Sequence, residues 1–246
     1  MEVHHHTHTP GKKWTHYFWE FLMLFLAVFC GFLAENQREH YIEHQREKQY
    51  IIALINDLEF DTAALSNNLT WKVRKLKNID SSLYPLIMLE KDEIPLRICW
   101  KLFGGIDDIY FFSNNGTITQ LKNSGGLRLI SKRNIVDSIE AYDWQIKRLG
   151  LRQEDWRSYH FIIREIPGRF ISMKNLLRES QDSTYSPRPG ANPESKIPIN
   201  KSYQDELIIQ YRFLRGLTYY DERIISQASK KAENLIKILK KEYHLK

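Results

Sequence analysis

An apolar run near the N-terminus constrains this chain more than any other feature of its sequence. Residues Phe21–Ala34 carry no charged side chain. The run reaches 21 residues when it includes the aromatic cluster just before it, which comprises Trp14, Tyr17, Phe18 and Trp19. A helix of that length measures about 31 Å, which matches the hydrocarbon core of a bilayer. Because aromatic residues are also enriched at membrane interfaces, the sequence predicts a transmembrane helix over residues 14–34.

A cleaved signal peptide is the main alternative interpretation of this segment. A plausible cleavage site follows Ala34, but Phe32 then occupies a position where signal peptidases require a small side chain. We therefore expect an uncleaved anchor.

The orientation of the anchor depends on its flanking charges. Basic residues occur on both sides, Lys12 and Lys13 before the segment and Arg38 soon after it, so their number does not decide the topology. The two lysines lie directly against the membrane segment, and a short basic tail ahead of a first apolar run usually stays in the cytoplasm. The sequence therefore predicts a cytoplasmic N-terminus and a large domain on the opposite side of the membrane.

The rest of the chain has the composition of a folded, water-exposed protein. Its mean hydropathy is −0.49 and 27% of its residues are charged, so a membrane segment must be local. We expect three regions, namely a disordered His-rich tail over 1–13, the transmembrane helix over 14–34, and a helical extramembrane domain over 35–246. No glycine or proline occurs between Phe32 and Tyr84, which favours a long continuous helix that ends near Leu76, ahead of a break at Pro85.

Two short helices and two long helices are expected further along. Proline, glycine and serine positions delimit the predicted helices, which cover 96–103, 115–123, 131–166 (capped by Ser131) and 203–243, and a Pro-rich loop over 180–202. The last helix repeats buried-type residues with heptad spacing: Leu207, Tyr211, Leu214, Thr218, Asp221, Ile225, Ala228, Ala232, Leu235 and Leu239. The predicted fold class is mostly α, with one N-terminal transmembrane helix that continues into an elongated antiparallel helical bundle.

Two segments resemble a known protein family. The first is His16–His40 (HYFWEFLMLFLAVFCGFLAENQREH), and the second is Thr119–Ile130 (TQLKNSGGLRLI). Both are similar to an uncharacterised family of single-pass membrane proteins from Bacteroidota with a His-bearing N-terminal tail. The resemblance implies a single-pass protein of a bacterial membrane, and together with the orientation predicted from the flanking charges we expect the inner membrane, with the large domain in the periplasm. It implies no activity and no functional residue.

Several residues of the membrane segment predict self-association. Small residues with helical spacing, Ala27, Gly31 and Ala34, allow close approach of two helices in lipid. Glu20 lies about 9 Å past Trp14 along the helix axis, where an isolated charge is costly. It can pair with His16, or it can form a ring of glutamates in a homo-oligomer together with Glu35 at the exit from the membrane.

Two groups of histidines are candidate metal ligands. His40 and His44 flank Glu43 in an H-x-x-E-H pattern, which is also found in a class of zinc peptidases, but no third ligand is evident. The alternative is a solvent-exposed helix face. The tail cluster of His4, His5, His6 and His8 can bind a transition metal through imidazole, or it is simply a polar tail.

No nucleotide-binding, nucleophile or kinase motif is present, so we expect no catalytic residue and no cofactor. Basic residues alternate with acidic ones, as in Arg46, Glu47 and Lys48, which argues against nucleic-acid binding despite the net charge of +6. The leading hypothesis is a non-enzymatic envelope protein that serves scaffolding, sensing or assembly and contacts the bilayer, its own copies and an unidentified envelope partner. The alternatives are an oligomeric ion or proton conduit lined by Glu20 and a membrane-tethered zinc hydrolase.

Overall fold

The computed structural model describes residues 14–181 and 186–245. The chain divides into two compact units, Met1–Gln49 and Tyr50–Lys246. The first helix, α1 (Trp14–Ile87), has its early residues in the first unit and its later residues in the second. Within the described part of the chain, it is the one helix that is long and apolar enough to cross a membrane, and its apolar stretch is entirely unburied.

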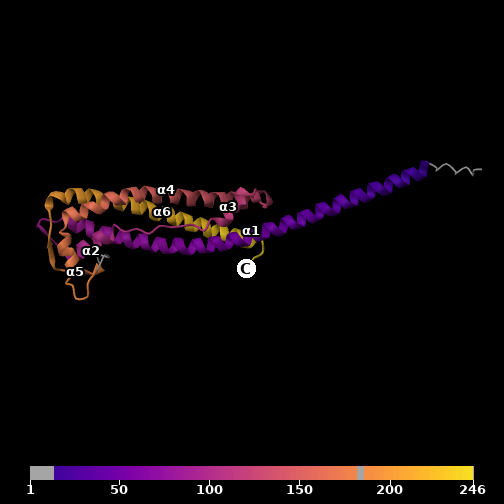
Figure 1. Cartoon of the computed structure of the whole chain (residues 1–246). Coiled ribbons are helices and arrows are strands. Elements are labelled where there is room, and N and C mark those ends of the chain that lie inside the picture. The colour runs from indigo at the N-terminus through magenta and orange to yellow at the C-terminus, as the bar shows by residue number, and fades with distance from the viewer. Residues whose placement is uncertain (1–13, 182–185, 246) are drawn as a thin grey trace, which may run out of the picture. The chain divides into compact units, whose positions relative to one another are not determined.

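The second unit is a bundle of three long helices (Figure 1). Residues 50–87 of α1 pack with α4 (Arg133–Phe170) and α6 (Gln204–Glu242). One apolar cluster joins Ile51 of α1, Ile135 of α4 and Leu239 of α6. Another cluster joins the opposite ends of the same helices and includes Leu86, Phe170 and Leu207. It follows that α4 runs parallel to α1 and that α6 runs antiparallel to both.

The heptad pattern of α6 explains how this helix packs against α1 and α4. All ten heptad residues predicted from the sequence are buried. Thr218 and Asp221 are polar exceptions on a face that is otherwise apolar, and Thr218 satisfies its hydroxyl by donating to the carbonyl oxygen of Leu214. The predicted fold class, a mostly α chain with a long N-terminal apolar helix and a helical bundle, is confirmed.

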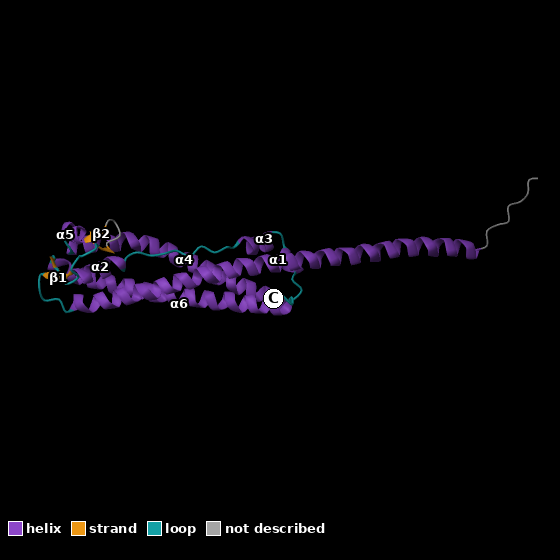
Figure 2. Cartoon of the chain, turned by 90° about the horizontal axis from the view of Figure 1, so that it is seen from below, coloured by secondary structure: helices purple, strands orange, loops and turns teal. Residues whose placement is uncertain are grey.

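Short elements close the two ends of the bundle. They are β1 (Glu93–Pro95), α2 (Leu96–Gly104), α3 (Gly116–Asn123), η1 (Gly126–Leu129), α5 (Met173–Glu179), β2 (Ser180–Gln181), β3 (Ser186–Pro187), β4 (Lys196–Pro198) and η3 (Lys201–Tyr203). Strand β1 pairs antiparallel with β4 and places Ile94 opposite Ile197, both of which are buried. The loop 105–115 between α2 and α3 returns along the bundle, so that α4 can start beside the start of the bundle part of α1 (Figure 2).

The predicted C-terminal ends of two helices were wrong. Helix α1 was expected to end near Leu76, ahead of a break at Pro85, but it continues through Pro85 to Ile87. Helix α4 was expected to end at residue 166, but it continues through Pro167 to Phe170. A proline near the end of a helix removes only one backbone hydrogen bond. In each case a fully buried side chain follows the proline, Leu86 in α1 and Phe170 in α4, and its packing holds the last turn in place.

Two smaller expectations were also wrong. Ser131 does not cap α4, because the residue that precedes the helix is Lys132, and it forms no side-chain cap hydrogen bond. The segment 180–202 is not loop throughout, since it contributes the short strands β2, β3 and β4. Strand β4 owes its existence to a partner, β1, that lies about a hundred residues earlier in the sequence, and local sequence does not encode such a pairing.

Candidate functional site

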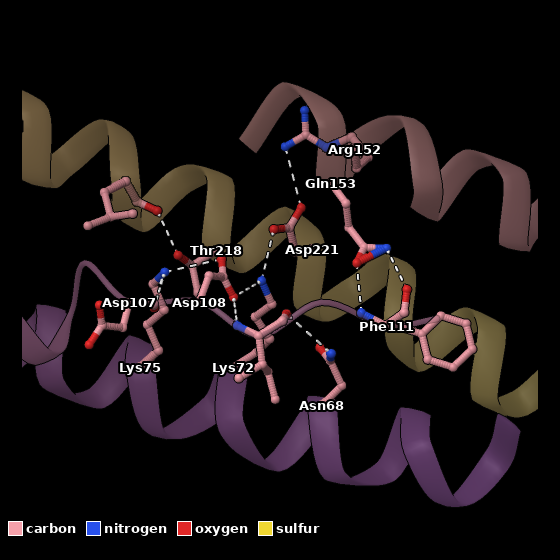
Figure 3. Close-up of polar contacts among 12 residues, drawn as sticks. Asn68, Lys72, Lys75, Asp107, Asp108, Phe111, Arg152, Gln153, Thr218 and Asp221 are labelled. Atoms are coloured by element: carbon pink, nitrogen blue, oxygen red, sulfur yellow. Dashed lines mark hydrogen bonds and ion pairs between the residues drawn. The ribbon is translucent and has the colours of Figure 1, made fainter. Parts of the chain in front are cut away.

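Ionic side chains meet in the middle of the bundle, between α1, α6, α4 and the loop 105–115 (Figure 3). We call this set, Lys72, Lys75, Asp108, Arg152 and Asp221, the charge network. The Nζ atom of Lys72 lies 2.7 Å from Oδ1 of Asp108 and 3.2 Å from Oδ2 of Asp221. The three side chains are each at most 8% exposed. Helix α1, helix α6 and the loop therefore share one buried ammonium group.

Lys75 is the most deeply buried member of the charge network, with no exposed side-chain surface. Its ammonium group donates to the carbonyl oxygen of Asp107 at 2.9 Å and to Oδ2 of Asp108 at 3.2 Å. The Nζ atom also lies 4.0 Å from the centroid of the Trp156 ring, within the range of a cation–π interaction. Burial, with help from the neighbouring charge of Lys72, lowers the pKa of Lys75 to about 8, although Asp108 opposes the shift.

Asp221 connects the interior of the bundle to its surface. Burial raises the pKa of Asp221, and the nearby charges of Lys72 and Arg152 oppose that effect. Arg152 reaches Asp221 through a long contact of 3.5 Å between Nη2 and Oδ1, and it reaches Asp155 at 3.4 Å. Its Nε atom is buried without a hydrogen-bond partner among the described residues. Arg152 is 24% exposed, so it forms the outer edge of the charge network.

Hydrogen bonds from side chains of α1 and α4 to the backbone of the loop 105–115 hold this loop against the two helices. Gln153 of α4 forms two hydrogen bonds with the backbone of Phe111, one accepted from the N–H at 2.7 Å and one donated to the carbonyl oxygen at 3.0 Å. From α1, Asn68 donates to the carbonyl oxygen of Ile109 at 3.4 Å. The loop thus packs where a fourth helix could lie, and its backbone N–H and C=O groups form hydrogen bonds with side chains of the helices.

Asp61 of α1 organises the next part of the loop. Its carboxylate accepts hydrogen bonds from the Ser113 hydroxyl at 2.9 Å, from the Asn114 N–H at 2.7 Å and from the Tyr142 hydroxyl at 2.6 Å. Burial and the Asp61 carboxylate together raise the pKa of Tyr142, so its hydroxyl stays a proton donor. This arrangement ties α1, α4 and the loop together.

A surface pocket adjoins the charge network at Arg152. It has a volume of about 410 Å³ and is lined by Arg152, Arg212, Phe213, Gly216, Leu217 and Tyr220. All but the first residue belong to α6, at spacings that place them on one side of that helix. This pocket is a crevice between α4 and α6.

Burial limits the chemistry open to Lys75. A lysine with a lowered pKa can act as a nucleophile, but Lys75 has no exposed surface from which to reach a substrate. Within residues 14–181 and 186–245, no group of three or more His, Cys, Asp or Glu side chains could hold a metal ion. The geometry is that of a buried ionic network with a crevice at its edge.

The residues predicted from the sequence to act in the membrane lie on α1 in the first unit. Nε2 of His16 lies 3.2 Å from Oε1 of Glu20, so the predicted pair is present. Glu35 pairs with Arg38, with a shortest contact of 2.6 Å. The small residues Ala27, Gly31 and Ala34 are exposed, and a Cβ atom on the glycine would meet nothing within 4 Å.

Among the described residues, the predicted metal ligands do not join a group of three or more His, Cys, Asp or Glu side chains that could hold a metal ion. Nδ1 of His44 lies 3.3 Å from Oε2 of Glu47, which is an i, i+3 pair on the same helix, and His40 is exposed. The tail residues His4, His5, His6 and His8 lie outside the described residues.

The charge network was not predicted from the sequence, although one signal pointed to it. Asp221 occupies a heptad position among apolar residues, and an acid on a buried face needs a buried cation. On α1, Lys72 and Lys75 continue the helical spacing of Leu65 toward Ile79, so they lie on the same buried face. The sequence could not predict which lysine pairs with Asp221, because Lys72 and Asp221 are 149 residues apart.

Comparisons of this chain with protein-family models, curated proteins and solved structures found no match. The function is therefore argued from the geometry of the chain itself.

Proposed function

We propose that this chain is a membrane-anchored, non-enzymatic envelope protein whose helical domain senses a ligand or scaffolds a partner. The observation that carries the proposal is α1, whose apolar stretch is unburied over its whole length while the same helix supplies one of the three long helices of the bundle. An exposed apolar surface of this length is costly in water and favourable in lipid. The proposed location is the bacterial inner membrane, with the N-terminus in the cytoplasm and the bundle in the periplasm.

The bundle supports a role in sensing or assembly. Its polar interior is built to hold α1, α4 and α6 in one register, and the crevice beside Arg152 gives a ligand access to the edge of that interior. Buried ionic groups are best attested as devices that specify register. Partners of such a domain would be the bilayer, further copies of the chain, and an envelope protein that passes on the signal.

Membrane anchoring is tested with paired lysine substitutions. We expect wild-type protein to remain in the membrane pellet after carbonate extraction at high pH. The double variant Phe25→Lys, Phe29→Lys should fail to insert and be released, because each lysine is charged at the pH of the cell and costs about 3 kcal/mol at the centre of a membrane helix. The control Phe112→Lys, Phe161→Lys replaces two exposed phenylalanines of the second unit and should stay in the pellet.

Cysteine labelling in intact cells tests the predicted topology. A cysteine introduced at the exposed Pro189 should react with a membrane-impermeant maleimide in intact cells once the outer membrane is permeabilised. The native Cys99 contributes little background, since burial raises its pKa to about 12 and keeps it protonated. Labelling only after the inner membrane is opened would show that the bundle faces the cytoplasm.

We also propose that the first unit brings copies of the chain together in the membrane. Glu20, Ala27, Gly31 and Ala34 share one side of α1, because their spacing of seven, four and three residues returns to the same helix face. We expect Gly31→Ile combined with Glu20→Leu to shift the mass of the solubilised protein toward the monomer. The control Phe25→Leu, Phe29→Leu changes the opposite face and should leave the mass unchanged. A wild-type monomer by light scattering in several mild detergents would contradict self-association, and the conduit alternative with it.

A further inference from the structure

The crevice between α4 and α6 has the composition of a binding site for a small organic anion. Two of its six lining residues are arginines, three are apolar or aromatic, and none is acidic. Its volume of about 410 Å³ falls within the range of pockets that hold small molecules. No lining residue is a metal ligand, and a bare inorganic anion would make no favourable contact with the apolar walls.

The two arginines of the crevice, Arg152 and Arg212, have N–H groups that form no hydrogen bond with the described residues. Arg212 forms no hydrogen bond or ion pair with any residue in the described part of the chain. The hydrogen bonds of Arg152 among the described residues are the two long ones to Asp155 and Asp221, and its Nε atom has no hydrogen-bond partner there. A guanidinium group has five N–H donors that suit a carboxylate. Both arginines can therefore accept an anionic group without giving up a good internal bond.

The walls of the crevice are held in place by neighbours outside it. The ring of Phe213 packs on Tyr159 of α4, with ring centroids 4.9 Å apart. The guanidinium carbon of Arg152 lies 5.9 Å from the centroid of the Tyr220 ring. These contacts make the crevice a preformed feature of the helix pair.

Gly216 keeps the floor of the crevice open. It lies inside a 39-residue helix, where glycine is destabilising by about 1 kcal/mol relative to alanine. Close packing does not require it, because a Cβ atom at this position would meet nothing within 4 Å. The effect of the glycine that the structure shows is the space that it leaves in the crevice.

We infer that this crevice binds an amphipathic organic carboxylate, with the carboxylate on Arg152 and Arg212 and the apolar body against Phe213, Leu217 and Tyr220. The inference rests on the proposed function and supplies the ligand class for its sensing role. A carboxylate bound there shares Arg152 with Asp221, and Asp221 shares Lys72 with Asp108. The ligand thus acts on the buried charge network from its outer edge.

The test uses the full chain in phosphatidylcholine nanodiscs, titrated with 4-phenylbutyrate in a calorimeter and compared with empty discs. We expect saturable binding at one site per chain. The uncharged 4-phenylbutyramide, of nearly the same shape, should bind about tenfold more weakly, because it cannot form charge-assisted hydrogen bonds.

Variants of exposed residues then locate the site. Arg212→Gln should weaken binding of 4-phenylbutyrate by about tenfold, and Gly216→Leu should abolish binding by filling the crevice. The matched control Arg223→Gln removes another exposed arginine of α6, one that lies beside Tyr219 and outside the crevice, and should bind like wild type. Far-UV circular dichroism verifies that each variant is folded.

Three results would overturn the inference: no saturable heat above that of empty discs, equal affinity for the amide, or equal affinity of the Arg212→Gln and Arg223→Gln variants. The failure of this site is distinguishable from failure of the proposed function. A protein that leaves the membrane on carbonate extraction but binds 4-phenylbutyrate rejects the anchor alone. A retained protein without binding rejects the site alone.

Discussion

Replacing Asp108 with alanine should lower the free energy of unfolding of the bundle by about 3–5 kcal/mol. The carboxylate of Asp108 accepts from both Lys72 and Lys75, and it is only 2% exposed. Its removal leaves two buried ammonium groups with one remaining carboxylate of the charge network, Asp221, which pairs with Lys72 and Arg152 and forms no ion pair with Lys75. Urea denaturation of the full chain in a mild detergent, followed by circular dichroism and tryptophan fluorescence, measures the loss.

The neighbouring Asp107 provides the matched control. It is exposed, and the atom that Lys75 contacts is its backbone carbonyl oxygen, which an alanine retains. Asp107→Ala should therefore change the free energy of unfolding by about 0.5 kcal/mol or less. Equal losses for the two variants would show that the charge network does not stabilise the fold in the way its geometry indicates.

Lys75 should raise the stability of the bundle by about 1 kcal/mol between pH 7 and pH 9. The ordinary pKa of lysine is 10.5, and burial lowers the pKa of Lys75 to about 8 in the folded chain. Between these two values Lys75 binds fewer protons in the folded chain than in the unfolded chain, so its contribution to the free energy of unfolding increases with pH. Below pH 8 the lysine is protonated in both states, and the full cost of burying its charge is present.

A cysteine and two tyrosines reverse the trend at higher pH. Burial raises the pKa of Cys99 from 9.0 to about 12, and it also raises the pKa of Tyr142 and of Tyr211 above the ordinary value of 10. Above pH 9 these groups lose their protons more readily in the unfolded chain than in the folded chain. Stability then falls as the pH increases, and a maximum near pH 9 is expected in denaturation curves collected across this range.

Two lysine variants assign the rising part of the curve. Lys75→Met removes the titrating group and should abolish the rise between pH 7 and pH 9. Lys77→Met, which removes an exposed lysine two residues away, should leave the rise intact. A wild-type curve that is flat over this range, or one that falls, would contradict the lowered pKa of Lys75.

The sequence by itself determined which surfaces of the chain are apolar and how long they are. The exposed stretch of α1, the buried heptad face of α6 and the boundaries of α2 and α3 all follow from the spacing of apolar residues and from nearby glycines and prolines. These features depend on neighbours within one or two helical turns, so a single sequence suffices to predict them.

Local rules failed where a buried side chain outweighed them. Proline predicts a helix end because it removes a backbone hydrogen bond. At Pro85 and Pro167 that loss is outweighed by the burial of Leu86 and Phe170, which keep the helix going for two or three more residues. The depth at which a residue is buried depends on elements far along the chain, and no local pattern contains it.

Only the tertiary structure decided the pairing of charges and the position of the crevice. Asp108 meets Lys72 because the loop 105–115 returns along the bundle, and Asp221 meets the same lysine because α6 runs antiparallel to α1. Arg152 and Arg212 line one crevice for the same reason, since they lie on different helices that pack together. Spacing along one helix shows which face a charge occupies, but its partner is set by the packing of helices that are distant in sequence.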